Sequence, residues 1–166
     1  MDHEIYSDGY IRGILGQVRT IAMVGASPNW YRPSHFAMKY LQAKGYRVIP
    51  INARAAGEVF LGERVFASLA QVPEPFDMVQ VFLTSKAAGP ITDQAIAIAQ
   101  DKGVKVLWMQ LGVRNDAAAQ RAEAAGLQVV MNRCPKIEYG RLHSELSWGG
   151  FNSGIISARR PKVRIG

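Results

Sequence analysis

The sequence predicts an α/β domain of three layers, with a Rossmann-like, doubly wound parallel sheet. Short apolar segments of strand length alternate along the chain with segments whose apolar residues recur at helical spacing. The expected strands are apolar nearly throughout, which is typical of parallel sheets that helices cover on both faces. Because crossovers between parallel strands are right-handed, the expected strand order is 3-2-1-4-5-6.

The first elements are the most regular part of this pattern. We expect an outer helix over residues 8–15 and a buried strand over Thr20–Val24. The next helix begins near Ser34 and ends at Gly45, a residue type favoured just after a helix C-terminus. A second strand over Arg47–Ile51 follows at once.

The segment between residues 58 and 75 is less regular. We expect a short edge strand over residues 64–66 and a turn of helix over residues 68–71. The edge strand would be the third strand of the predicted order.

The second half returns to clear alternation. Buried strands are expected over residues 77–83, 104–110 and 127–131. Pro90 is expected to open the intervening helix that Gly103 ends, since proline is favoured in the first helical position. An alanine-rich helix over residues 116–125 and a short helix from Pro135 complete the set.

Length and composition favour one domain. With 166 residues, 48% of them hydrophobic, the chain is long enough for one substantial core. We expect residues 1–146 to form this domain and residues 147–166 to form a basic extension with glycines and aromatics.

An acidic N-terminus and the lack of a long apolar run predict a cytoplasmic protein. One cysteine and three scattered histidines predict no disulfide and no structural metal.

The net charge of +7 has two interpretations, because part of it lies in the extension. Arg159, Arg160, Lys162 and Arg164 sit there with no acid among them. They form either a solvated end or a contact for nucleic acid. The positive charge of the remaining chain suits a small anionic ligand.

Ligands of doubly wound sheets bind at the carboxyl ends of the strands, beside the point where the strand order reverses. This rule selects the loops at residues 25–34, 50–54, 84–90 and 110–114. In the first loop, Gly25, Ala26 and Ser27 connect a buried strand to a helix, and a helix N-terminus favours phosphate. The alternative is a tight turn with a structural role only.

The second strand argues against a simple NAD site. It is followed by Asn52, Ala53 and Arg54, where such a site normally carries an acid that binds ribose hydroxyls. Arg54 and Arg32 instead suit a phosphate on a ribose, as in NADP or in the 3′-phosphate of coenzyme A (CoA).

Several ordered motifs resemble one family, the small stand-alone CoA-binding proteins of bacteria and archaea. These motifs span about residues 8–143 and include Val24-Gly25-Ala26-Ser27-Pro28, Arg32-Pro33-Ser34 and the segments 45–52, 77–82, 107–113, 125–127 and 131–138. The family is similar to the CoA-binding domain of the succinyl-CoA synthetase alpha subunit.

The resemblance implies CoA or an acyl-CoA as the ligand and assigns roles to the matching residues. Gly25, Ala26 and Ser27 would wrap the pyrophosphate. Arg32 and Ser34 would contact phosphates at the helix start, and Asn52 with its neighbours, Arg54 included, would line the adenosine side. Met109 and Gln110 would border the pocket where the strand order reverses.

One departure from the family concerns the fourth strand. Where the family often has Phe-Arg, this chain has Phe82-Leu83, followed by Thr84, Ser85 and Lys86. A phosphate contact is lost there unless Lys86 replaces it, and lysine lacks the bidentate fork of arginine. We therefore expect weaker or altered affinity.

The residues favour a binding module over an enzyme. The phosphorylated histidine and the second subunit that the synthetase needs have no evident counterpart, and no hydrolase or P-loop motif is present. Three alternatives stay open: an NADP-linked oxidoreductase, a CoA-dependent transferase that needs a partner chain, and a nucleic-acid-associated protein. A membrane partner is not expected, and the chain is expected to act alone, as an oligomer or with a partner subunit.

Two further features each have two interpretations. Cys134 precedes Pro135 near a helix start, between Arg133 and Lys136, and is either a redox-active thiol or a packed side chain. Trp30 and Tyr31 either stack on the ligand or only cover the pocket.

Overall fold

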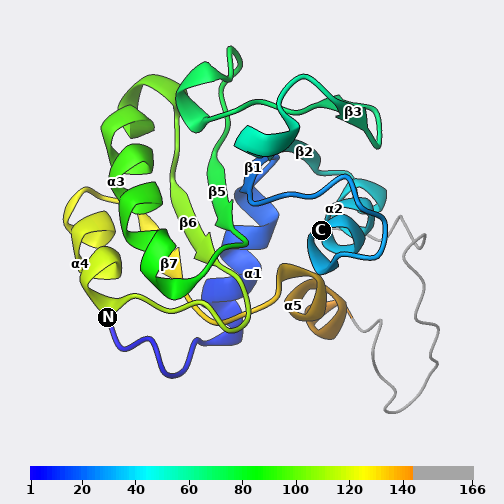
Figure 1. The fold of residues 1–166 in the computed structure, drawn as a ribbon. Helices are drawn as coiled ribbons and strands as arrows, with labels where there is room; N and C mark the ends of the chain where they lie inside the picture. The colour runs from blue at the N-terminus through cyan, green and yellow to red at the C-terminus, as the bar shows by residue number, and fades with distance from the viewer. Residues whose placement is uncertain (144–166) are drawn as a thin grey trace.

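Five parallel strands form the central sheet of the computed structural model, which describes residues 1–143 (Figure 1). The predicted extension at residues 147–166 lies outside the described residues. In spatial order the strands are β2 (Arg47–Ile51), β1 (Thr20–Val24), β5 (Met78–Val81), β6 (Val106–Met109) and β7 (Gln128–Val130). The strand order reverses between β1 and β5, which confirms the predicted Rossmann-like α/β fold.

Helices cover both faces of this sheet (Figure 1). One face carries α3 (Ser85–Lys102) and α4 (Asp116–Ala124). The opposite face carries α1 (Asp8–Gln17), α2 (Pro33–Ala43) and α5 (Pro135–Leu142). None of the helices within residues 1–143 has the length and apolar character needed to cross a membrane.

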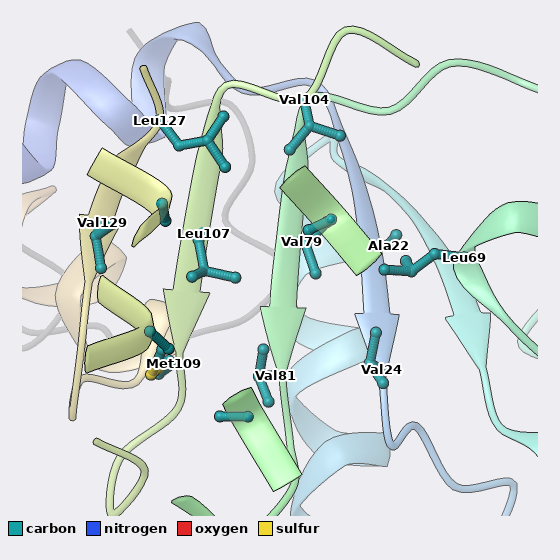
Figure 2. Close-up of a cluster of buried hydrophobic side chains, with 14 of the residues drawn as sticks. Ala22, Val24, Leu69, Val79, Val81, Val104, Leu107, Met109, Leu127 and Val129 are labelled. Carbon is teal, nitrogen blue, oxygen red and sulfur yellow. The ribbon is translucent and has the colours of Figure 1, made fainter. Parts of the chain in front are cut away.

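Alternate strand residues supply the two cores, because successive side chains of a strand point to opposite faces. On the α3 and α4 face, Figure 2 shows Ala22, Val79, Leu107 and Val129 side by side on four neighbouring strands, all fully buried. Each large apolar side chain buried in this way stabilises the fold by about 1.5–3 kcal/mol. The sheet is thus a rigid platform whose carboxyl edge carries the connecting loops.

The prediction of an edge strand over residues 64–66 is wrong in its pairing. β4 (Glu63–Arg64) pairs antiparallel with β3 (Val59–Phe60) in a separate hairpin. Only Phe66 forms a parallel bridge, to Ile51 at the end of β2. The third strand of the predicted order is therefore reduced to one bridge, and the expected helical turn is the short 3₁₀ helix Leu69–Gln71.

The prediction that Pro90 opens the helix after β5 is also wrong, since α3 begins at Ser85. Thr84 is the N-cap, and its hydroxyl accepts a hydrogen bond from the Ala87 amide at 3.1 Å. Pro90 lies inside the helix, where it removes a donor to the Lys86 carbonyl. Both residues are exposed, so water can satisfy that carbonyl.

We expect Thr84→Ala to lower the free energy of unfolding by about 0.5–2 kcal/mol, because the cap hydrogen bond is lost. Thermal unfolding measures the change, which corresponds to a few degrees in Tm. Gln100→Ala, at an exposed position of the same helix, is the matched control. Equal melting temperatures for the two variants would show that the cap contributes nothing.

Candidate functional site

A cavity of about 700 Å³ opens at the carboxyl ends of β1 and β2. Its walls come from the turn after β1, the start of α2, the 3₁₀ helix Ala53–Ala55 after β2, the segment around Ser68, the end of β5 and the first turns of α3. This volume lies within the usual range of small-molecule sites.

The turn after β1 depends on Gly25. Its backbone has φ +92°, and a Cβ atom there would lie 2.2 Å from the Phe82 carbonyl oxygen. The Gly25 amide donates to the Ile51 carbonyl at 2.9 Å, and the Phe82 amide donates to the Val24 carbonyl at 2.8 Å. A residue with a side chain would have to separate β1 from β5, so only glycine closes this turn.

The start of α2 leaves backbone donors beside the turn. Arg32 is the N-cap, but its side chain makes no capping hydrogen bond. Ser34, buried in the first turn of the helix, accepts a hydrogen bond at Oγ from the Ser27 amide at 3.0 Å. The helix N-terminus and its positive dipole end therefore face the cavity in a form suited to an anion.

Asn52 joins the two loops that hold the cavity open. Its Nδ2 donates to the Ala26 carbonyl at 2.8 Å, and its Oδ1 accepts from the Arg54 amide at 2.9 Å. Ala26 is fully buried and acts through its backbone. The asparagine is thus a bridge between the β1 turn and the β2 loop.

Positive charge dominates the cavity. Among the described residues, Arg32 and Arg54 are the charged side chains of its lining, and no acid lines it. Neither arginine forms an ion pair within residues 1–143, and both are exposed. Two unpaired guanidinium groups favour a ligand with more than one anionic group.

The structure brings half of the candidate residues together around the cavity. Those that line the cavity are Gly25, Ser27, Arg32, Ser34, Asn52 and Arg54. The other six lie outside the lining: the buried Ala26, and Thr84, Ser85, Lys86, Met109 and Gln110. Contacts of either group with CoA stay predictions.

The residues outside the lining have other positions. Lys86 is exposed on α3, and Ser85 accepts a hydrogen bond from the Arg114 amide at 3.0 Å. Met109 is fully buried in the core under α3 and α4. Gln110 lies half-buried at the edge, beyond the end of β6.

Sequence reasoning missed the apolar wall of the cavity. Leu83, just after β5, lines the cavity with Ile91 and Gln94 of α3. Ser68 and Leu69 line it as well, and the sequence assigned no binding role to them. Ile91 and Gln94 reach the cavity only because of how α3 packs, and residue spacing does not reveal that packing.

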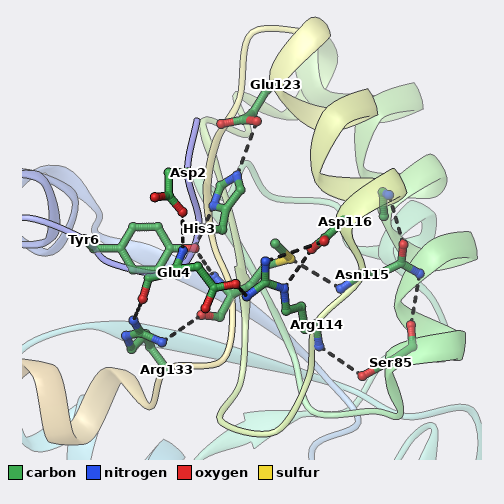
Figure 3. A network of polar contacts seen from close by, with 12 residues as sticks. Asp2, His3, Glu4, Tyr6, Ser85, Arg114, Asn115, Asp116, Glu123 and Arg133 are labelled. Atoms are coloured by element: carbon green, nitrogen blue, oxygen red, sulfur yellow. Dashed lines mark hydrogen bonds and ion pairs between the residues drawn. The ribbon is translucent and has the colours of Figure 1, made fainter.

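The loop at residues 110–114 is held by the N-terminal segment (Figure 3). Arg114 pairs with Glu4 at 2.7 Å and with Asp116 at 2.8 Å. Its hydrogen bond lowers the pKa of the Asp116 carboxyl, and the two acids raise the pKa of the Arg114 guanidinium. This arginine is therefore engaged within the protein, unlike Arg32 and Arg54.

The remaining candidates lie apart from the cavity lining. Cys134 is a half-buried free cysteine at the N-cap of α5, without a side-chain capping bond. Trp30 and Tyr31 are exposed in the loop before α2 and contact each other edge to face at 6.0 Å. Within the described residues, no group of three or more His, Cys, Asp or Glu side chains is arranged to hold a metal ion.

Comparison with known proteins gives consistent matches. The model of the family described as CoA binding domain matches residues 19–140. The uncharacterized protein YneT of Bacillus subtilis (strain 168) is 31% identical over 133 residues, which cover 80% of this chain and 94% of that protein.

Two solved structures are similar over most of the chain. A hypothetical protein from Pyrococcus horikoshii OT3 has a TM-score of 0.76 and 37% identity, covering 86% of this chain and 99% of that one. A Thermus thermophilus protein has a TM-score of 0.73 and 34% identity, covering 82% and 99%.

Proposed function

The chain belongs to the family of CoA-binding domains, and on this premise we propose that its cavity binds coenzyme A or an acyl-CoA. The observation that carries the proposal is a pair of cavity-lining arginines that have no acid partner in the described part of the chain: Arg32 at the start of α2 and Arg54 after β2. CoA carries a pyrophosphate and a 3′-phosphate, so it supplies separate anions for two such groups.

The pyrophosphate belongs at the start of α2. The turn Gly25–Ser27 lets the ligand approach the backbone closely, and the helix N-terminus offers N–H groups with the positive dipole end. Arg32 lies at the same helix end and would add a charge-assisted hydrogen bond. These features support phosphate binding without any catalytic group.

The adenosine belongs on the β2 side of the turn. Arg54 follows β2 and would pair with the 3′-phosphate, the group that distinguishes CoA from dephospho-CoA. Ala53 and Leu69, which follow β2 in the chain, offer apolar surface for the base, and Ser68 offers a hydroxyl beside them. Mixed walls of this kind are usual for nucleotide-sized ligands.

The proposed activity is binding, and catalysis is not part of it. Among residues 1–143, the cavity lining contains no histidine, cysteine or carboxylate that could act as nucleophile or general base. An NADP-linked reaction or a transferase reaction with a partner chain is the alternative, and the ligand preference separates the first of these from the proposal.

Calorimetric titration with CoA, dephospho-CoA and NADP tests the proposal. We expect CoA to bind most tightly, because only CoA presents both the pyrophosphate and the 3′-phosphate in the arrangement described. Dephospho-CoA should bind more weakly by about the value of one charge-assisted contact, roughly 1.5–3 kcal/mol. Binding of NADP without binding of CoA would overturn the proposal in favour of the oxidoreductase.

A further inference from the structure

Two glutamines meet at the carboxyl edge of the sheet, outside the cavity lining. Gln80 belongs to β5 and is fully buried. Its Nε2 donates a hydrogen bond to Oε1 of Gln110 at 3.0 Å. Gln110 directly follows β6, and its amide donates to the Val81 carbonyl at 3.1 Å. The pair therefore lies on the same edge of the sheet as the turn after β1.

A glutamine at position 80 is unfavourable for the stability of the fold. Its partners in register on the neighbouring strands are Met23 and Trp108, which are both buried and apolar in character. Its Oε1 is buried and has no hydrogen-bond partner within residues 1–143. A buried acceptor without a partner destabilises a folded protein. Stability alone therefore does not account for a glutamine here.

The hydrogen bond determines what Gln110 can offer to a ligand. Gln80 takes one of the two lone pairs of the Gln110 carboxamide oxygen and fixes the orientation of that carboxamide, while both N–H donors of its Nε2 stay available to a ligand. Gln110 is half-buried, which leaves the group within reach of a bound molecule. Gln110 is thus oriented as a donor and suits a carbonyl oxygen.

The proposed placement of CoA brings a carbonyl to this point. Adenosine lies on the β2 side of the phosphates, so the pantetheine arm leaves on the β5 and β6 side. Neighbouring strands are about 4.8 Å apart, so the end of β6 lies roughly 10 Å along the edge from the turn after β1. The arm contains amide groups, and an acyl-CoA adds a thioester carbonyl.

We infer that Gln80 is a positioning residue that presents the amide of Gln110 to a carbonyl oxygen in the pantetheine arm or acyl group of CoA. This inference rests on the proposed function. Gln110 makes the contact, and Gln80 acts through it from inside the core.

Titration with two ligands tests the inference. CoA is compared with adenosine 3′,5′-bisphosphate, which carries the adenosine and the 3′-phosphate but no pantetheine arm. Gln110→Leu should weaken CoA about 2- to 12-fold, the range for one neutral hydrogen bond, and leave the bisphosphate unchanged. Gln80→Met should also weaken CoA, by no more than Gln110→Leu does, while keeping or raising the Tm because it removes the unpartnered acceptor; unchanged CoA affinity in Gln80→Met would overturn the positioning role.

The outcomes separate the inference from the proposal beneath it. Unchanged CoA affinity in Gln110→Leu, or equal losses for both ligands, would overturn the inference and leave CoA binding intact. A variant with both Gln80→Met and Gln110→Leu should bind CoA as tightly as Gln110→Leu alone. Weaker CoA binding by the double variant would show that Gln80 does not act through Gln110. Wild-type protein that binds neither ligand would overturn the proposed function itself. Gln80→Leu also removes the carboxamide at similar volume, so the role of Gln80 stays testable even if Gln80→Met does not fold.

Discussion

Gly25→Ala is expected to lower the free energy of unfolding by about 2–5 kcal/mol and to abolish CoA binding. A left-handed backbone costs a residue with a Cβ about 1–2 kcal/mol. The overlap with the Phe82 carbonyl, 2.2 Å away, adds about 1–3 kcal/mol, because backbone rather than a flexible side chain must move. Thermal unfolding should show a fall in Tm of about 2–4 °C per kcal/mol for a chain of this size.

Gly45→Ala is the matched control for this prediction. Gly45 also has a positive φ, +101°, but a Cβ atom at this position would meet no other heavy atom within 4 Å. It precedes β2, at the opposite end of the strand from the cavity. Gly45→Ala should therefore lose only the free energy of unfolding that the left-handed backbone costs, and it should keep its CoA affinity. Equal losses in the two variants would mean that the contact with Phe82 has no special weight.

Arg32→Ala is expected to weaken CoA about 10- to 150-fold. The guanidinium has no acid partner within the described residues, so its removal leaves no buried charge behind and the loss reports the ligand contact. A hydrogen bond to a charged group contributes about 1.5–3 kcal/mol, which corresponds to that factor. Titration calorimetry at constant ionic strength measures it, since the interaction is screened by salt.

Arg12→Ala and Arg54→Ala complete this experiment. Arg12 is an exposed arginine of α1 outside the cavity lining, so its removal changes net charge without touching the site. Arg54→Ala should weaken CoA but not dephospho-CoA, because its expected partner is the 3′-phosphate. An Arg32→Ala variant that binds CoA as tightly as Arg12→Ala would remove Arg32 from the site.

The fold could be predicted from sequence wherever an element is long and strongly patterned. The strand Thr20–Val24 and the helix Asp116–Ala124 are examples, because apolar residues there recur at one clear period. The hairpin of β3 and β4 has two residues per strand, too few to carry a period. Pro90 was expected to open α3 because proline is favoured in the first turn of a helix. The actual N-cap is Thr84, six residues earlier, which is also a residue type favoured at that position.

The candidate site was predictable to the extent that it follows directly from strand ends. Gly25, Arg32 and Arg54 lie in the connections that follow β1 and β2, where doubly wound sheets bind ligands. Met109 shows the limit of that reasoning. Its side chain lies in the core, on the same face of the sheet as Leu107. Whether it borders the pocket depends on where β6 ends, and β6 continues as far as Met109. Ile91 and Gln94 enter the site only through the packing of α3.

The most direct test of the account is a crystal structure of the protein with CoA bound. We predict that the pyrophosphate lies within hydrogen-bonding distance of backbone amides in the turn Gly25–Ser27 and the first turn of α2. Arg54 should contact the 3′-phosphate, and the pantetheine arm should run toward Gln110. CoA bound away from this cavity, or with its adenosine on the β6 side of the turn, would contradict the account.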